Sequence, residues 1–106
     1  MQQMEAPEKM GHVFVDSLMD WGWRLGPSCH LHTLPGHEAE LHAMATLLGI
    51  RRAWYQVNSS MPHYDLTFSH RLLAIRAGAI EVNRRQTVSH IRAWRAARAI
   101  NTRAAA

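Results

Sequence analysis

The sequence has a single cysteine, a single lysine and no long hydrophobic run. Cys29 is alone among 106 residues, so it can form no disulfide within the chain, which is typical of a reducing compartment. No apolar run approaches the ~20 residues that cross a bilayer, and residues 1–9 lack the apolar centre of a signal peptide. We therefore expect a cytoplasmic protein with no membrane association.

Acidic residues are absent from the end of the chain. Residues 1–83 carry six basic and eight acidic side chains, a net charge of −2, whereas residues 84–106 carry six arginines and no acid. The formal charge of +4 therefore comes from the terminal segment. Any attraction of nucleic acid by charge depends on that segment and not on the body of the protein.

The remaining composition is that of a globular protein. Apolar residues make up 47% and charged residues 19% of the chain, a balance that excludes extensive disorder. A chain of this length has room for one domain with a modest core. We divide it into an N-terminal extension (residues 1–9), an α/β core domain (10–85) and a basic C-terminal helix or tail (86–106).

Hydrophobic patterns predict alternating strands and helices. Runs of β-branched and aromatic residues predict four strands, at residues 12–16, 29–33, 53–57 and 79–83. Helical periodicity predicts three helices, over residues 37–48, 68–77 and about 87–100. Thr67 is the expected N-cap of the second helix, with Phe68, Leu72 and Ile75 facing inward. This order favours an α/β fold: one domain with a small parallel or mixed sheet of about four strands and two to three helices.

Polar side chains gather where the expected strands end. Asp16 ends the first strand, His30 lies in the second, and His63 and Asp65 fall in the expected loop over residues 58–66. Ligands of open α/β sheets bind beyond the carboxyl ends of the strands. We therefore expect Asp16, His63 and Asp65 to be catalytic and, together with His30, to bind one divalent metal ion. The structural alternative is that each aspartate merely stabilises a turn.

The start of the helix expected at 68–77 suggests an anion site. Thr67, Ser69 and Arg71 surround its N-terminus, where free backbone amides attract phosphate. Arg84, at the end of the last strand, completes the set of predicted phosphate-binding residues. Capping by Thr67 alone is the simpler alternative, and the two are compatible.

One apparent zinc-protease motif is excluded by its spacing. His37 and His42 flank two glutamates but stand five residues apart, which separates them by about 140° around a helix. The motif needs histidines four apart.

Several segments together resemble one family. They include Val-Phe-Val-Asp16, Glu40-Leu-His42-Ala-Met-Ala, Pro-His63-Tyr-Asp65-Leu and Ala77-Gly-Ala-Ile-Glu81-Val. Over about residues 10–85 the chain resembles a bacterial and phage family catalogued as domain of unknown function 4031, and the His-Tyr-Asp step is the most specific part. The family supplies no established activity. The resemblance implies that residues 1–9 are an extension and that the arginine tail lies outside the shared domain.

The first function left open is that of an enzyme. It would be a metal-assisted hydrolase acting on a nucleotide or another phosphate-containing substrate. Asp16, His63 and Asp65 would hold the metal ion, and Arg71 or Arg84 would neutralise phosphate charge. No catalytic motif in the sequence is complete, so whether the chain is an enzyme is left open.

The second function is a non-catalytic accessory module. Arg92, Arg95 and Arg98 repeat every three residues and could bind nucleic-acid phosphates, while an apolar strip packs on the body: Val88, Ile91 and Trp94. The same helix could instead bind a protein partner or pair with a second copy in a homodimer. A solvated helix that arginine keeps soluble is the simplest alternative.

Overall fold

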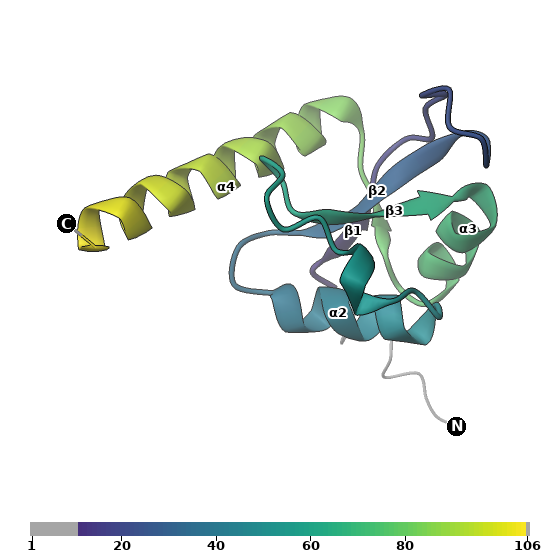
Figure 1. Cartoon of the computed structure of the whole chain (residues 1–106), viewed down its shortest axis with the longest axis horizontal. Helices are drawn as coiled ribbons and strands as arrows, with labels where there is room; N and C mark the ends of the chain where they lie inside the picture. Colours follow the sequence, from purple (N-terminus) through teal and green to yellow (C-terminus); the bar gives the residue numbers. More distant parts are fainter. Residues whose placement is uncertain (1–10, 106) are drawn as a thin grey trace.

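The computed structural model describes residues 11–105, in which four strands form one mixed sheet (Figure 1). The strands are β1 (Val13–Val15), β2 (Ser28–Thr33), β3 (His63–Thr67) and β4 (Ile80–Glu81), in the order β3-β2-β1-β4. β2 is antiparallel to β1 and β3, whereas β1 and β4 are parallel. The expected α/β class and four-stranded sheet are confirmed. The extension expected over residues 1–9 lies outside the described residues.

Within residues 11–105, three α-helices and one short 3₁₀ helix surround the sheet. They are α2 (Glu38–Leu47), η1 (Arg52–Trp54), α3 (Phe68–Arg76) and α4 (Arg84–Ala105). The cap expected at the start of α3 is confirmed, since the hydroxyl of Thr67 accepts a hydrogen bond from the backbone N–H of His70 at 3.2 Å. No helix in the described part of the chain is long and apolar enough to cross a membrane.

The sheet has one apolar face and one polar face, because side chains alternate along each strand. The apolar face carries Val13, Val15, Cys29, Leu31, Tyr64 and Leu66, which form the buried core with Leu41, Met44 and Ala45 of α2 and Ala74 of α3. The alternate positions carry the residues of the polar face: Phe14, Asp16, His30, His32, His63 and Asp65. All the histidines of the strands therefore lie on one side.

The first half of α4 packs against the polar face, across the sheet from α2 (Figure 1). The indole N–H of Trp94, which is buried, donates a hydrogen bond to the carbonyl of Thr33 at 2.7 Å. The ring of His90 lies 4.6 Å from that of Phe14 and 5.2 Å from that of His32. The second half of α4 projects beyond the sheet (Figure 1).

Two expected elements are wrong. The strand expected at 53–57 is instead η1 followed by extended chain, and the loop expected at 58–66 contains most of β3. The polar residues of β3 are the reason that this segment was predicted to be a loop. They alternate with Tyr64 and Leu66, which are buried in the core, so the segment has the period of a strand with one polar face.

The expected inward face of α3 is also wrong in part. Phe68 is 57% and Leu72 43% exposed, whereas Ala74 is buried and Ile75 packs against the core. A small residue at position 74 lets the helix approach the sheet closely, and the helix turns its larger apolar residues outward. The last helix is longer than expected, beginning at Arg84 and ending at Ala105.

Candidate metal centre

The register of the sheet brings four candidate residues together on its polar face. Asp65 of β3 is directly opposite His30 of β2, and Asp16, which follows β1, lies on the other side of His30 with its carboxylate 2.7 Å away. His63 approaches His30 diagonally, with ring centroids 4.4 Å apart. We expected the residues to meet at the carboxyl edge of the sheet. That location is wrong, because His63 and Asp65 lie within β3 and not in a loop beyond the end of a strand, so the residues meet on a face of the sheet.

Three of these side chains can converge on one ion. Each of His30, His63 and Asp65 offers one ligand atom, and the three atoms lie within 4.8 Å of one another. Nε2 of His63 is 3.4 Å from Oδ1 of Asp65. Two imidazoles and one carboxylate on one side, with the remaining positions open, are the ligand set of many mononuclear metal enzymes.

The second nitrogen of each imidazole is already occupied, which orients the ring. Nδ1 of His30 donates to Oδ2 of Asp16 at 2.7 Å, and Oδ1 of the same carboxylate accepts the backbone N–H of His30, also at 2.7 Å. Nδ1 of His63 donates to the carbonyl of Met61 at 2.7 Å. Both rings therefore keep Nε2 for a ligand. A carboxylate or carbonyl behind a histidine is the usual arrangement in metal sites.

Asp16 therefore differs from its expected role as a metal ligand. Both of its oxygens accept hydrogen bonds from His30, so it positions that ring, and it is not among the three residues whose ligand atoms converge. The corresponding support for Asp65 is Gln56, whose side-chain amide donates to Oδ2 at 2.6 Å. Each of the three candidate ligands thus has one polar partner that holds it in place.

The protonation states follow from burial and from these hydrogen bonds. Burial alone would raise the pKa of Asp16, but the hydrogen bonds from His30 hold that pKa below its ordinary value. The same contact with Asp16 raises the pKa of His30, whereas burial lowers the pKa of His63. Burial raises the pKa of neighbouring Cys29 to about 12. The free thiol therefore stays protonated at neutral pH, and Cys29 lies in the apolar core, on the opposite face of the sheet from the candidate ligands.

The group of ligand atoms opens into a pocket of about 470 Å³. Its other walls come from Trp21 and Trp23 of the loop between β1 and β2, and from Gln56. A second pocket, of about 400 Å³, adjoins at Asp16 and His30 and has Arg84 at its rim. A substrate can therefore reach the cluster from the solvent.

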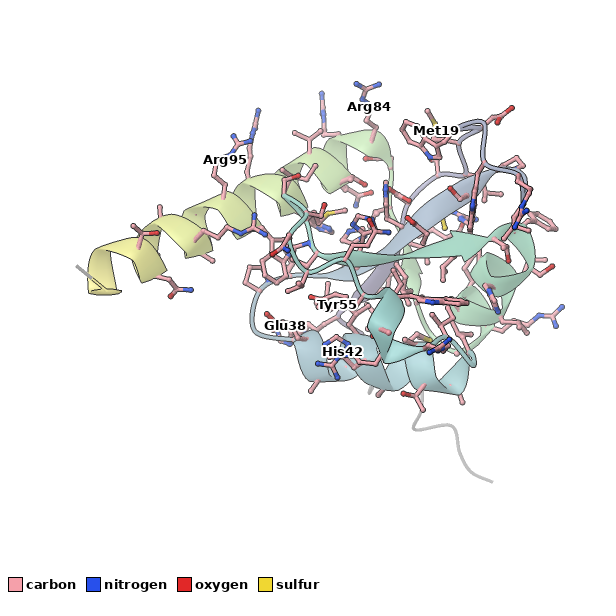
Figure 2. The ribbon with its side chains drawn as sticks, in the orientation of Figure 1. Met19, Glu38, His42, Tyr55, Arg84 and Arg95 are labelled. Carbon is pink, nitrogen blue, oxygen red and sulfur yellow. The ribbon has the colours of Figure 1, made fainter. Side chains whose placement is uncertain are left out.

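The predicted phosphate-binding residues do not surround one anion. Nε of Arg71 donates to the backbone carbonyl of Asp16 at 2.9 Å, and its terminal nitrogen lies 3.3 Å from Glu81. Thr67 lines a different pocket from Arg84. Figure 2 shows that Arg84 and Arg95 both extend outward from α4. Ser69 is exposed on the surface of α3.

The three arginines predicted to bind nucleic acid are not equivalent. Arg92 and Arg95 are exposed. Arg98 is turned toward the body: its guanidinium donates to the carbonyls of Ser59 and Ser60 at 2.5 and 2.9 Å and lies 5.9 Å from the ring centroid of Trp94. Two of its hydrogen bonds are therefore made within the chain.

Two histidine contacts were not anticipated from the sequence. Nε2 of His32 and Nδ1 of His90 are 3.0 Å apart, across 58 positions of sequence, so no local pattern could have revealed the pair. His12, His37 and Glu40 also form a group with ligand atoms within 4.8 Å. His42 does not belong to that group. It lies beside Tyr55 (Figure 2) and is hydrogen-bonded to the Tyr64 hydroxyl at 2.8 Å, which agrees with the exclusion of a zinc-protease motif.

The comparison with known families gives one match. The model of the family described as "Protein of unknown function (DUF4031)" matches residues 13–94. The match therefore extends beyond Arg85, where we expected the shared domain to end, and includes the part of α4 that packs on the sheet. No curated protein and no solved structure matches the chain significantly.

Proposed function

The chain belongs to the family of proteins of unknown function DUF4031, and we propose that it holds one divalent metal ion on His30, His63 and Asp65. The observation that carries this proposal is the convergence of three ligand atoms within 4.8 Å on the polar face of the sheet. The second observation in its favour is that both imidazoles are oriented from behind by fixed acceptors.

The donor set selects the kind of metal. Two imidazole nitrogens and one carboxylate oxygen suit Zn²⁺, Mn²⁺, Fe²⁺ or Ni²⁺ better than Mg²⁺ or Ca²⁺, which prefer oxygen ligands. Because the protein supplies three ligands, positions remain for water and substrate. Such an ion acts as a Lewis acid and lowers the pKa of water.

The reaction that this arrangement supports best is hydrolysis of a phosphate-containing substrate. Asp16 keeps the proton on Nδ1 of His30, so that Nε2 remains available as a ligand. Gln56 fixes the Asp65 carboxylate from one side, and Trp21 and Trp23 partly enclose the centre. Arg84, at the rim of the adjoining pocket, supplies positive charge for a phosphate.

Calorimetry with matched variants tests the proposal. Protein treated with EDTA and titrated with Zn²⁺ or Mn²⁺ should bind one ion at this centre, and His63→Ala and Asp65→Asn should remove that binding. His37→Ala, which changes the separate group of His12, His37 and Glu40, is the control and should leave it intact. The metal-loaded protein should hydrolyse bis(p-nitrophenyl) phosphate, and EDTA or His63→Ala should abolish turnover. Metal binding that is unaffected by His63→Ala and Asp65→Asn would contradict the proposal.

A second candidate function is nucleic-acid binding by α4. The helix has no acidic residue, and Arg92 and Arg95 are exposed, with Arg95 extending outward from α4 (Figure 2). Phosphate neutralisation by exposed arginines gives binding without sequence preference. This function does not require the metal centre, so the two can be tested separately.

A further inference from the structure

An apolar pocket adjoins the candidate metal centre. It has a volume of about 640 Å³ and shares Trp23, Gln56 and Asp65 with the pocket at the metal ligands. Most of its remaining wall is apolar or aromatic: Leu25, Ile50, Trp54 and Tyr55. The carboxylate of Asp65 thus stands between a polar centre and an apolar cleft.

Several large apolar side chains in the walls of this pocket are exposed to solvent. Leu25 is 61%, Trp54 58% and Trp23 39% exposed. Single exposed apolar residues are common on protein surfaces, but a contiguous group around a hollow marks a binding site. Small-molecule sites have this composition, with mostly apolar walls and a few polar groups that fix orientation.

The loop that carries Trp23 is held in place by specific contacts. Met19 and Ser28 exchange two backbone hydrogen bonds at 2.8 and 2.9 Å, and the N–H of Gly22 donates to the side chain of Asp20 at 2.9 Å. Gly22 has a φ of +77°, which a residue with a side chain rarely adopts. The pocket wall is therefore shaped before any ligand arrives.

We propose that this pocket binds the base of a nucleotide whose phosphate lies at the metal centre. The inference rests on the proposed function and adds the substrate class to it. Indole rings stack on the flat face of any base, and the shared wall at Asp65 places the stacked ring next to the ligand atoms. Arg84 lines a third pocket, which shares Trp21 and His30 with the pocket at the metal ligands. The groove thus offers, in order, an aromatic cleft, metal ligands and a cation, which matches a base, a reacting phosphate and a further negative charge.

The test uses the full chain in EDTA, so that base binding is measured without metal. By calorimetry, AMP should bind at least about tenfold more tightly than ribose 5-phosphate, which lacks the base. Trp54→Ala should weaken AMP binding about 5- to 150-fold, the usual range for loss of one stacking contact, and Trp54→Phe should restore most of it. Leu47→Ala, which removes a side chain that is 63% exposed on α2 and does not line the pocket, should have no effect.

The outcomes separate this inference from the proposed function. No AMP binding, equal binding of AMP and ribose 5-phosphate, or an unchanged affinity in Trp54→Ala would overturn the pocket assignment. If AMP binds as expected but His63→Ala leaves metal binding unchanged, the base pocket stands and the hydrolase proposal fails. Because Trp54 is largely exposed, its replacement should not unfold the protein, and a thermal melt of the variant checks this.

Discussion

At the scale of single residues, Asp16 acts on the candidate centre through another side chain. Its carboxylate accepts two hydrogen bonds from His30 and is not among the three groups whose ligand atoms converge. The sequence analysis placed Asp16 among the ligands because ligands of α/β sheets bind beyond the carboxyl ends of the strands. Only the antiparallel pairing of β1 and β2 shows that His30 lies between Asp16 and the centre.

We expect Asp16→Asn to lower metal affinity about 10- to 100-fold, the usual effect of removing a polar partner behind a ligand. The amide cannot stabilise the same charge on His30, while its similar shape should preserve the backbone contact. The measurement is calorimetric titration of the EDTA-treated variant with Zn²⁺, next to a thermal melt without metal. An affinity equal to that of the native chain, with the fold intact, would show that Asp16 has no positioning role.

A second residue-scale prediction concerns His32, whose side chain is fully buried. Burial lowers its pKa from an ordinary value of 6.5 to about 4, and nearby His90 contributes in the same direction. Between pH 6.5 and pH 4 the unfolded chain binds this proton and the folded chain does not. The free energy of unfolding should therefore fall as the pH falls through this range, by about 3 kcal/mol for a shift of this size.

Urea denaturation between pH 7 and pH 4 of the native chain and of His32→Gln measures this contribution. Asp16, His30 and His90 also face or adjoin His32 and remain in both proteins, so the difference between the two pH profiles isolates His32. The variant should lose less stability on acidification. Parallel profiles would contradict a neutral, buried His32.

At the scale of elements, helices were easier to predict than strands. The Thr67 cap of α3 is local and located the start of the helix correctly, although the apolar pattern gave its inward face wrongly at Phe68 and Leu72. β3 was missed because His63 and Asp65 have the composition of a loop, and they are tolerated in a strand only because one face of this sheet is polar. The face can stay polar because α4 covers only part of it. This arrangement depends on packing between distant segments, which no single segment of the sequence reveals.

The element-scale prediction concerns the arginines of α4. Of the three arginines of α4 predicted to bind nucleic acid, Arg92 and Arg95 are exposed, whereas Arg98 donates to the carbonyls of Ser59 and Ser60. Two phosphate contacts give a slope near −2 when the logarithm of the binding constant is plotted against that of the salt concentration. The reason is that each contact releases ~0.9 counterions. The double variant Arg92→Ala/Arg95→Ala should remove most of this slope in a fluorescence-anisotropy titration of duplex DNA, and Arg98→Ala should leave it nearly unchanged. No detectable binding of the native chain at low salt would end this alternative.

At the scale of the whole molecule, the two faces of the sheet differ: one carries the hydrophobic core and the other carries the candidate site. One face packs on α2 and α3 and contains the core, whereas the other collects the histidines and acids beneath α4 and the tryptophan-bearing loop. The candidate residues could be selected from the sequence by their positions near strand ends. Which of them lie together, and where on the sheet, could not be predicted from the sequence. This depends on the pairing of β1, β2 and β3, which are distant along the chain.

The most direct measurement is anomalous diffraction from crystals soaked with Zn²⁺ or Mn²⁺. We expect one strong peak about 2.0 to 2.2 Å from Nε2 of His30, Nε2 of His63 and a carboxylate oxygen of Asp65, as these ligands bind such ions. His30 should keep its hydrogen bond to Asp16 behind it. A peak only at the separate group of His12, His37 and Glu40, or no peak at either group, would contradict a metal centre on the polar face of the sheet.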